Sequence, residues 1–144
     1  MIFLTDANIS PKAARLLEVF DPRNEIRAFE HNFEMATPDI EWMHEVAQWN
    51  PKPIIICGDG NILRNKAEMM TLRDSDLMFV YLASGWTTLK WEEFAWKIIK
   101  AWPRITNNVR RANKATIFLI HVKSLKVERI CLVSELSKKT KLPR

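Results

Sequence analysis

The sequence predicts an α/β fold, a three-layer α/β/α sandwich around a mainly parallel central sheet. Short apolar runs alternate along the chain with segments whose apolar residues recur at three- and four-residue steps. The runs 54–57 and 77–82 are apolar almost throughout, which is typical of strands covered by helices on both faces. With 144 residues, 47% of them hydrophobic and 27% charged, the chain has the size and composition of one globular domain.

The first half of the chain is expected to hold three strands, at residues 1–5, 25–29 and 54–57. Ser10 and Pro11 begin the first helix, because Ser is a favoured N-cap and Pro a favoured first helical residue, and Asp21 ends it. The apolar face of that helix is expected to hold Ala13, Leu16, Leu17 and Phe20. The same reasoning begins a second helix at Thr37-Pro38-Asp39. Its buried face is expected to hold Ile40, Met43, Val46 and Ala47.

The second half continues the alternation, with a helix over about residues 63–72 and a strand over 77–82. Residues 91–102 match an amphipathic helix that Thr88 could cap. Pro103 is expected to end or kink that helix, and residues 107–113 to form a separate short helix. The last strands are expected at residues 115–122 and 127–133.

The expected domain covers residues 1–133, followed by a basic C-terminal tail at 134–144. Net charge is +5, but residues 138–144 contain four basic residues and no acid, which leaves 18 basic against 17 acidic residues. We expect a solvated tail, with a weak attraction for RNA or DNA phosphates as the alternative.

No apolar run approaches the roughly 20 residues of a membrane helix, and no basic segment opens a signal peptide. We therefore expect a cytoplasmic protein without membrane contact. Cys57 and Cys131 form no Cys-x-x-Cys pair, which argues against a disulfide framework or a thiolate zinc site. Cys57, inside a buried strand, is expected to be a core residue.

Two aspartates directly follow expected buried strands, Asp6 after the first and Asp59 after the third, and an asparagine stands two residues after each, at Asn8 and Asn61. Ligands of parallel sheets bind beyond the carboxyl ends of the strands. The two acids therefore converge only if these strands are neighbours, as in the flavodoxin-like order 2-1-3-4-5. Close carboxylates repel unless a proton or cation lies between them, and oxygen ligands suit Mg²⁺ or Mn²⁺. The alternative is that these residues only form turns.

A third acid would complete such a site, and Asp39 is the best candidate because it lies in the first turn of the second helix. The alternative role for Asp39 is to complement the helix dipole. Glu41 and Glu68 are candidates for supporting roles. A divalent metal held this way could generate a nucleophilic water and stabilise the charge on a phosphodiester.

Three stretches, residues 3–10, 37–42 and 55–62, together resemble the PIN-like domains, most closely a bacterial branch of VapC-type toxins. The likeness extends to about residue 122. It implies an Mg²⁺- or Mn²⁺-dependent endoribonuclease, often the toxin of a toxin–antitoxin pair. Asp6, Asp39 and Asp59 fall on the acidic positions of the family and are the implied catalytic metal ligands. Asn8 matches a polar position, and Asn61 replaces a fourth acid.

The expected partners are an RNA substrate, an antitoxin protein and a second copy of the chain in a homodimer. Candidate phosphate contacts are Arg64, Lys66, Arg110, Arg111 and Lys114. Each of these could instead be an ordinary surface cation. Trp96 interrupts a charged helix face and could mark a partner surface or pack against a neighbouring segment.

Two other interpretations stay open. A non-catalytic PIN-like module would bind a partner without holding metal. A receiver-like signalling domain would share the aspartates after strands one and three, with Ser84 and Lys123 after strands four and five. The receiver interpretation fits less well, because Asp6 lacks the second acid that receivers carry beside it.

Overall fold

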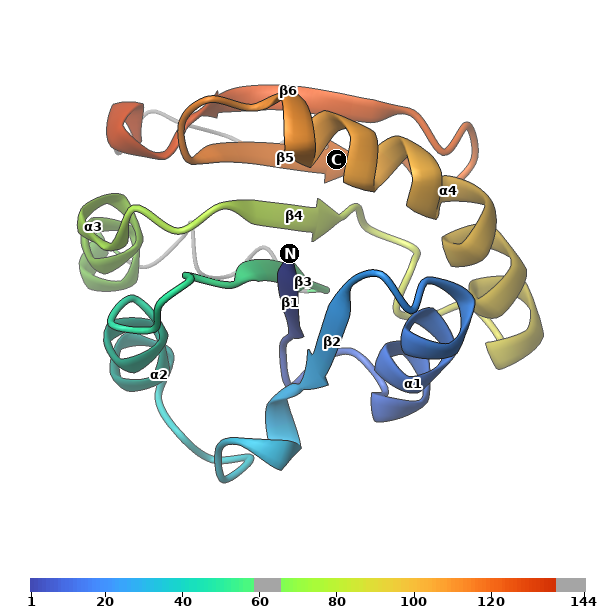
Figure 1. Cartoon of the computed structure of the whole chain (residues 1–144), viewed down its shortest axis with the longest axis horizontal. Helices are drawn as coiled ribbons and strands as arrows, with labels where there is room; N and C mark the ends of the chain where they lie inside the picture. The colour runs from blue at the N-terminus through green and yellow to red at the C-terminus, as the bar shows by residue number, and fades with distance from the viewer. Residues whose placement is uncertain (59–65, 137–144) are drawn as a thin grey trace.

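The computed structural model describes residues 1–58 and 66–136. Six strands of this part form one sheet in the order β2-β1-β3-β4-β5-β6 (Figure 1). The strands are β1 (Ile2–Thr5), β2 (Glu25–Ala28), β3 (Ile54–Cys57), β4 (Phe79–Leu82), β5 (Thr116–Ile120) and β6 (Val127–Leu132). All neighbouring pairs are parallel except β5 and β6. The predicted α/β sandwich is therefore confirmed, including the order 2-1-3-4-5.

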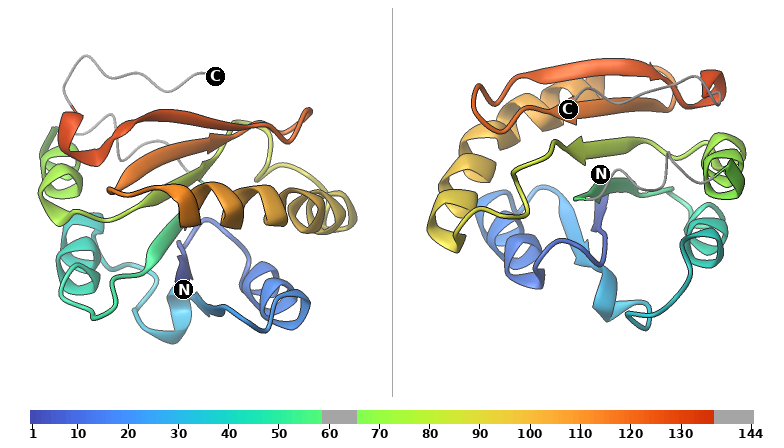
Figure 2. Two further views of the ribbon diagram at one scale, coloured as in Figure 1. Left: turned by 45° about the horizontal axis from the view of Figure 1, so that its top comes forward. Right: turned by 180° about the vertical axis from the view of Figure 1, so that it is seen from behind.

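Helices cover both faces of the sheet (Figures 1 and 2). Helices α1 (Pro11–Phe20) and α4 (Trp91–Arg111) pack on one face, and α2 (Asp39–Val46) and α3 (Lys66–Ser75) pack on the other. Side chains alternate along each strand, so Phe3 contacts the α1–α4 layer and Leu4 the α2–α3 layer. Strands β3, β4 and β5 are buried along their whole length, because helices cover both faces. This explains why their sequences are apolar throughout and do not alternate with polar residues.

Helix α1 begins and ends where the sequence predicts. The Ser10 hydroxyl accepts a hydrogen bond from the Lys12 amide at 3.2 Å, and the Asp21 amide donates to the Leu17 carbonyl at 2.8 Å. The buried residues are Ala13, Ala14 and Leu17. Phe20, expected on the buried face, is the last residue of the helix and is 46% exposed.

Helix α2 differs from the prediction in both its cap and its buried face. Pro38 is the N-cap residue, and the Thr37 hydroxyl donates to the Glu34 carbonyl instead of capping the helix. Trp42, Met43 and Val46 are buried, whereas Ile40 is 43% exposed. The helix is rotated in this way because the Trp42 ring packs edge-on against Phe29, with centroids 5.9 Å apart.

Helix α4 continues through Pro103, so of the two outcomes expected there the helix end is wrong, and so is the separate helix at 107–113. An interior proline costs a helix about 3 kcal/mol. The buried face nevertheless continues on both sides of it, through Ile98, Trp102, Ile105 and Val109. This packing outweighs the local cost. Thr88 is not the cap either: the N-cap is Lys90, and the Thr88 hydroxyl donates to the Gly85 carbonyl.

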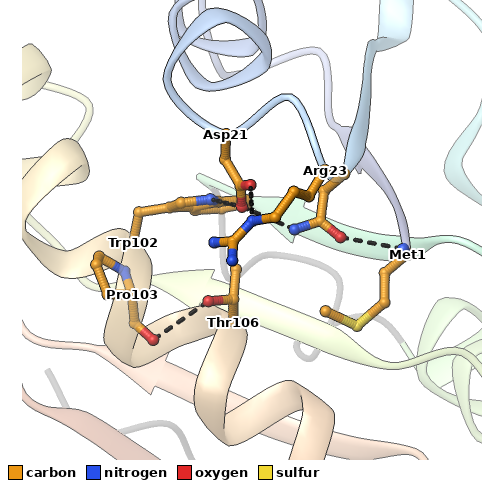
Figure 3. A network of polar contacts seen from close by, with 7 residues as sticks. Met1, Asp21, Arg23, Trp102, Pro103 and Thr106 are labelled. Atoms are coloured by element: carbon orange, nitrogen blue, oxygen red, sulfur yellow. Dashed lines mark hydrogen bonds and ion pairs between the residues drawn. The ribbon is translucent and has the colours of Figure 1, made fainter.

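A buried carboxylate joins the end of α1 to α4 (Figure 3). Asp21 is 4% exposed and accepts hydrogen bonds from Trp102 Nε1 at 3.0 Å, Asn24 Nδ2 at 2.7 Å and Arg23 Nε at 3.2 Å. Burial alone would raise the pKa of Asp21, but these donors together lower it below its ordinary value. The Trp102 ring also packs on Phe3 of β1, with centroids 4.7 Å apart, so this junction fixes α4 against the sheet.

The remaining boundaries differ slightly from the prediction. Helix α3 is described from Lys66 to Ser75, and the expected start near residue 63 lies outside the described residues. The fold continues past residue 133 through a 3-10 turn, η3 (Val133–Glu135), to Leu136, whose side chain is buried. Cys57 is buried, as predicted, and neither cysteine forms a disulfide. No helix among the described residues is long and apolar enough to cross a membrane.

Candidate functional site

Asp6 lies at the carboxyl end of β1, between β1 and β3. Its amide donates to the Ile56 carbonyl at 2.9 Å, which extends the β1–β3 ladder by one residue. The chain leaves β1 toward α1 on one face, whereas the helices that flank β3 cover the other. Such a point is where doubly wound sheets open a crevice for ligands. The neighbouring strands that the sequence hypothesis required are therefore present.

The Asp6 carboxylate is buried and held by backbone amides. It is 6% exposed, and its Oδ1 accepts from the Asn8 amide at 3.1 Å and the Gly58 amide at 3.4 Å. Burial raises the pKa of Asp6 to about 6, and the bonds from Gly58 and Asn8 only partly oppose this rise. None of the ion pairs between described residues involves Asp6. A cation bound beside this carboxylate would balance its negative charge.

A small cavity adjoins Asp6, which we call the Asp6 cavity. Its volume is about 100 Å³, room for a cation with a few waters of roughly 30 Å³ each. Asp6, Asn8 and Glu30 all line it. Glu30 belongs to the 3-10 turn η1 (Phe29–His31) after β2, and the sequence reasoning missed it. The available signal was that Glu30 also follows a strand whose carboxyl end reaches this edge of the sheet.

Asp39 lies in the first turn of α2 but is not among the residues that line the Asp6 cavity. Its Oδ1 accepts a hydrogen bond from Trp42 Nε1 at 2.8 Å, and Trp42 packs on Phe29, which does line the cavity. Asp39 therefore orients a core tryptophan near the site. Glu41, in the same helical turn, is exposed.

Three of the predicted site residues, Asp59, Asn61 and Arg64, lie outside the described residues. Lys66 is the exposed first residue of α3, and Glu68, in the same turn, is half-buried. Within residues 1–58 and 66–136, no three His, Cys, Asp or Glu side chains come together as a metal site. The described part of the chain thus supplies Asp6, Asn8 and Glu30 toward such a site, short of a full set of ligands.

Arg110 and Arg111 are exposed at the opposite edge of the sheet from Asp6. Helix α4 runs from the end of β4 back to the start of β5, and its 21 residues span roughly 30 Å. Val109 and Lys114 line a groove together with Met1 and Pro53, which precede β1 and β3. These cations therefore cannot contact a phosphate bound beside Asp6.

Gly58 allows three segments to meet next to Asp6. A Cβ atom at this position would lie 2.7 Å from the Thr87 methyl group and 3.3 Å from Ile9 Cγ1. Real Cβ contacts are not as short as 2.7 Å, so any larger residue must shift the Thr87 side chain or the loop that carries it. The close approach brings the Gly58 amide to the Asp6 carboxylate.

Comparison with protein-family models gives a match over the first part of the chain. A family model described as a PIN like domain matches residues 1–84, more than half of the chain, and this range includes Asp6, Asn8, Glu30 and Asp39. No curated protein matches the chain significantly, and no solved structure does so.

Proposed function

Because this chain belongs to the PIN-like domain family, we propose that it is a metal-dependent ribonuclease whose site lies beside Asp6. The observation that carries the proposal is the Asp6 carboxylate, which is buried at the ligand-binding edge of the sheet without a cationic partner among the described residues. Such a carboxylate is costly unless a proton or a metal ion neutralises it. Oxygen donors favour Mg²⁺ or Mn²⁺.

In this proposal Asp6 is the central ligand, and Glu30 and Asn8 contribute oxygen atoms from the same cavity. Asp59 and Asn61 are expected to complete the ligand set from the segment after β3. Bound Mg²⁺ or Mn²⁺ would supply a nucleophilic water and stabilise charge on the phosphodiester.

Asp39 remains a proposed metal ligand, although it does not line the Asp6 cavity. Its Oδ1 accepts the hydrogen bond from Trp42, which leaves Oδ2 for the metal. Glu41 and Glu68 are assigned supporting roles at the same edge. The cations proposed to contact the phosphate are Lys66, the first described residue of α3, and Arg64, two residues earlier in the sequence.

The test is cleavage of pooled single-stranded RNA, with single-stranded DNA in parallel, in Mg²⁺, Mn²⁺ or EDTA. Asp6→Asn should abolish cutting while the circular dichroism spectrum stays that of the wild type. Asp74→Asn is the matched control, because it makes the same chemical change on a carboxylate whose side chain is 73% exposed. Equal cutting by wild type and Asp6→Asn, or cutting that survives EDTA, would rule out the proposal.

A second candidate is a partner-binding PIN-like module without catalysis. It is favoured by the lack of three clustered metal-binding side chains among the described residues and by Asn61 in place of an acid. Titration with Mn²⁺ separates the two candidates: saturable binding that Asp6→Asn removes supports the nuclease, and no binding by the wild type supports the module.

The proposed biological role is that of a toxin held by an antitoxin, and it rests on the likeness to VapC-type toxins. Trp96, 52% exposed on α4, is the candidate contact for an antitoxin or for a second copy of the chain. Induced expression should arrest growth of a bacterial host, and Asp6→Asn should relieve the arrest. Growth arrest by both proteins alike would contradict a role that depends on this site.

A further inference from the structure

A second cavity, which we call the Trp91 cavity, lies next to the Asp6 cavity. Its volume is about 200 Å³, and it opens between the start of α1 and the loop that leads into α4. Asn8 lines both cavities, so a molecule bound in one lies directly beside a group bound in the other. The Trp91 cavity was not foreseen, because its walls come from segments about 80 residues apart.

The wall of the Trp91 cavity is a chain of three aromatic rings. Trp86 is fully buried, and its Nε1 donates to the Ile120 carbonyl at 3.0 Å. Its ring meets Phe94 edge-on, with centroids 5.6 Å apart, and Phe94 in turn stacks with Trp91 at 6.1 Å and 15°. Trp91 is 37% exposed. The wall therefore ends in a supported ring that is still open to solvent.

The ammonium group of Lys12 lies over the Trp91 ring. Lys12 Nζ lies 6.0 Å from the Trp91 ring centroid, and Lys12 is exposed on the first turn of α1. None of the ion pairs between described residues involves Lys12, so its charge is available to a ligand. Thr87 and Ser10 add hydroxyl groups to the lining, and Asn8 adds an amide.

We propose that the Trp91 cavity binds one unpaired nucleobase of the RNA, stacked against Trp91, with Lys12 on the adjoining phosphate. This inference rests on the proposed function, because the base would belong to the nucleotide next to the phosphate held at Asp6. Aromatic rings beside cations are how proteins grip single strands without reading their sequence. A volume of about 200 Å³ falls below the roughly 300–1,000 Å³ of sites for drug-sized ligands, which suits a single base.

The geometry has a consequence for the choice of substrate. A base can reach the ring only after it leaves a duplex, because in a duplex its neighbours cover both of its faces and pairing holds its edge. The enzyme should therefore cut unpaired segments and spare helical ones. Since every base has a stacking face, the preference among the four bases should be weak.

The experiment measures binding of a fluorescent single-stranded oligoribonucleotide to the full chain in EDTA, which withholds the metal needed for cutting. Trp91→Ala should weaken binding roughly 5- to 140-fold, the equivalent of losing one base–aromatic stack, and Trp91→Phe should restore most of it. Lys12→Ala should weaken binding and reduce its salt dependence. Phe20→Ala and Lys100→Ala are the controls, because they remove an exposed aromatic ring at the end of α1 and an exposed lysine of α4, neither of which lines the cavity.

An abasic strand of the same length separates stacking from charge. It should bind wild type and Trp91→Ala equally, because it keeps the phosphates and lacks the bases. Unchanged RNA binding by Trp91→Ala, or equal losses in Trp91→Ala and Phe20→Ala, would overturn the inference, and so would a wild type that binds no RNA.

The two proposals fail in different ways. If the wild type cuts RNA with metal but Trp91→Ala binds normally, only the base site is wrong. If the wild type binds RNA through Trp91 but never cuts it, only the nuclease is wrong.

Discussion

Asp6 is a carboxylic acid in a place that disfavours its charge. In the folded, metal-free protein its pKa is about 6, above the 3.8 of an exposed aspartate. A group with a raised folded pKa stabilises the fold fully below its unfolded pKa, and this contribution is lost as pH rises through the folded pKa. The difference corresponds to roughly 3 kcal/mol.

We therefore expect Asp6→Asn to stabilise the metal-free protein near neutral pH. Its gain in unfolding free energy over wild type should grow by about 1–3 kcal/mol between about pH 4 and pH 7.5. Urea denaturation in EDTA at several pH values measures this gain. A gain that does not change with pH would mean that Asp6 is not held as a buried acid.

Asp21 is the opposite case, a buried carboxylate that is well supplied with donors. Asp21→Ala leaves the Trp102 N–H buried without an acceptor, which should cost about 1–3 kcal/mol of unfolding free energy. Because the pKa of Asp21 is lowered, its contribution should persist above about pH 4 and fade in stronger acid. Arg23→Ala is the control in the same denaturation experiment, and it should cost less than about 1 kcal/mol because that side chain is 86% exposed.

At the same scale, the sequence could predict some site residues and not others. Asp6 was predictable because a buried strand delivers it to a known edge of the sheet. For Glu30 the sequence shows only that it follows a strand, because its final position depends on a 3-10 turn whose direction no local pattern encodes. The bond from Trp42 to Asp39 depends on the rotation of α2, which the position of Phe29 sets.

Among the helices and strands, local sequence patterns predicted the strands, but they failed for α4, where tertiary packing overrides the local preference. Pro103 is a strong helix breaker, yet α4 continues because its buried face extends to Val109. The expected helix end at Pro103 also prevented a correct placement of Arg110 and Arg111, because only an unbroken α4 carries them to the far edge of the sheet. Both outcomes depend on the packing of α4 against strands that are distant from it in the sequence.

The meeting of β3, the start of α1 and the loop before α4 at Gly58 gives a prediction for these elements. Gly58→Ala should cost about 1–3 kcal/mol, because the new Cβ would meet the Thr87 methyl group at 2.7 Å. Thr87→Ser removes that methyl group, so the double variant should recover most of the loss. Thermal unfolding of the four proteins measures the coupling, and purely additive effects would show that the crowding is not the cause.

For the molecule as a whole, metal binding should raise the free energy of unfolding. Ligand at 100 times its Kd adds about 2.7 kcal/mol, and each kcal/mol raises Tm by about 2–4 °C in a chain of this size. Saturating Mn²⁺ should thus raise the Tm of wild type and Asp74→Asn by about 5–10 °C, and that of Asp6→Asn by much less. Differential scanning calorimetry can record the shifts, and equal shifts in all three proteins would place the metal elsewhere.

Helix α4 lies wholly beyond residue 84, where the family match ends. A fragment cut there would keep Asp6 and β4 but lose α4, which together with α1 covers Phe3, Ile56 and Val80. We therefore expect that residues 1–84, which carry the family match, do not fold alone, because the rest of the chain supplies part of the cover on one face of the sheet. Expressed alone, residues 1–84 should give the broad amide spectrum of an unfolded or aggregated chain, whereas dispersed NMR signals would show that the signature can fold unaided.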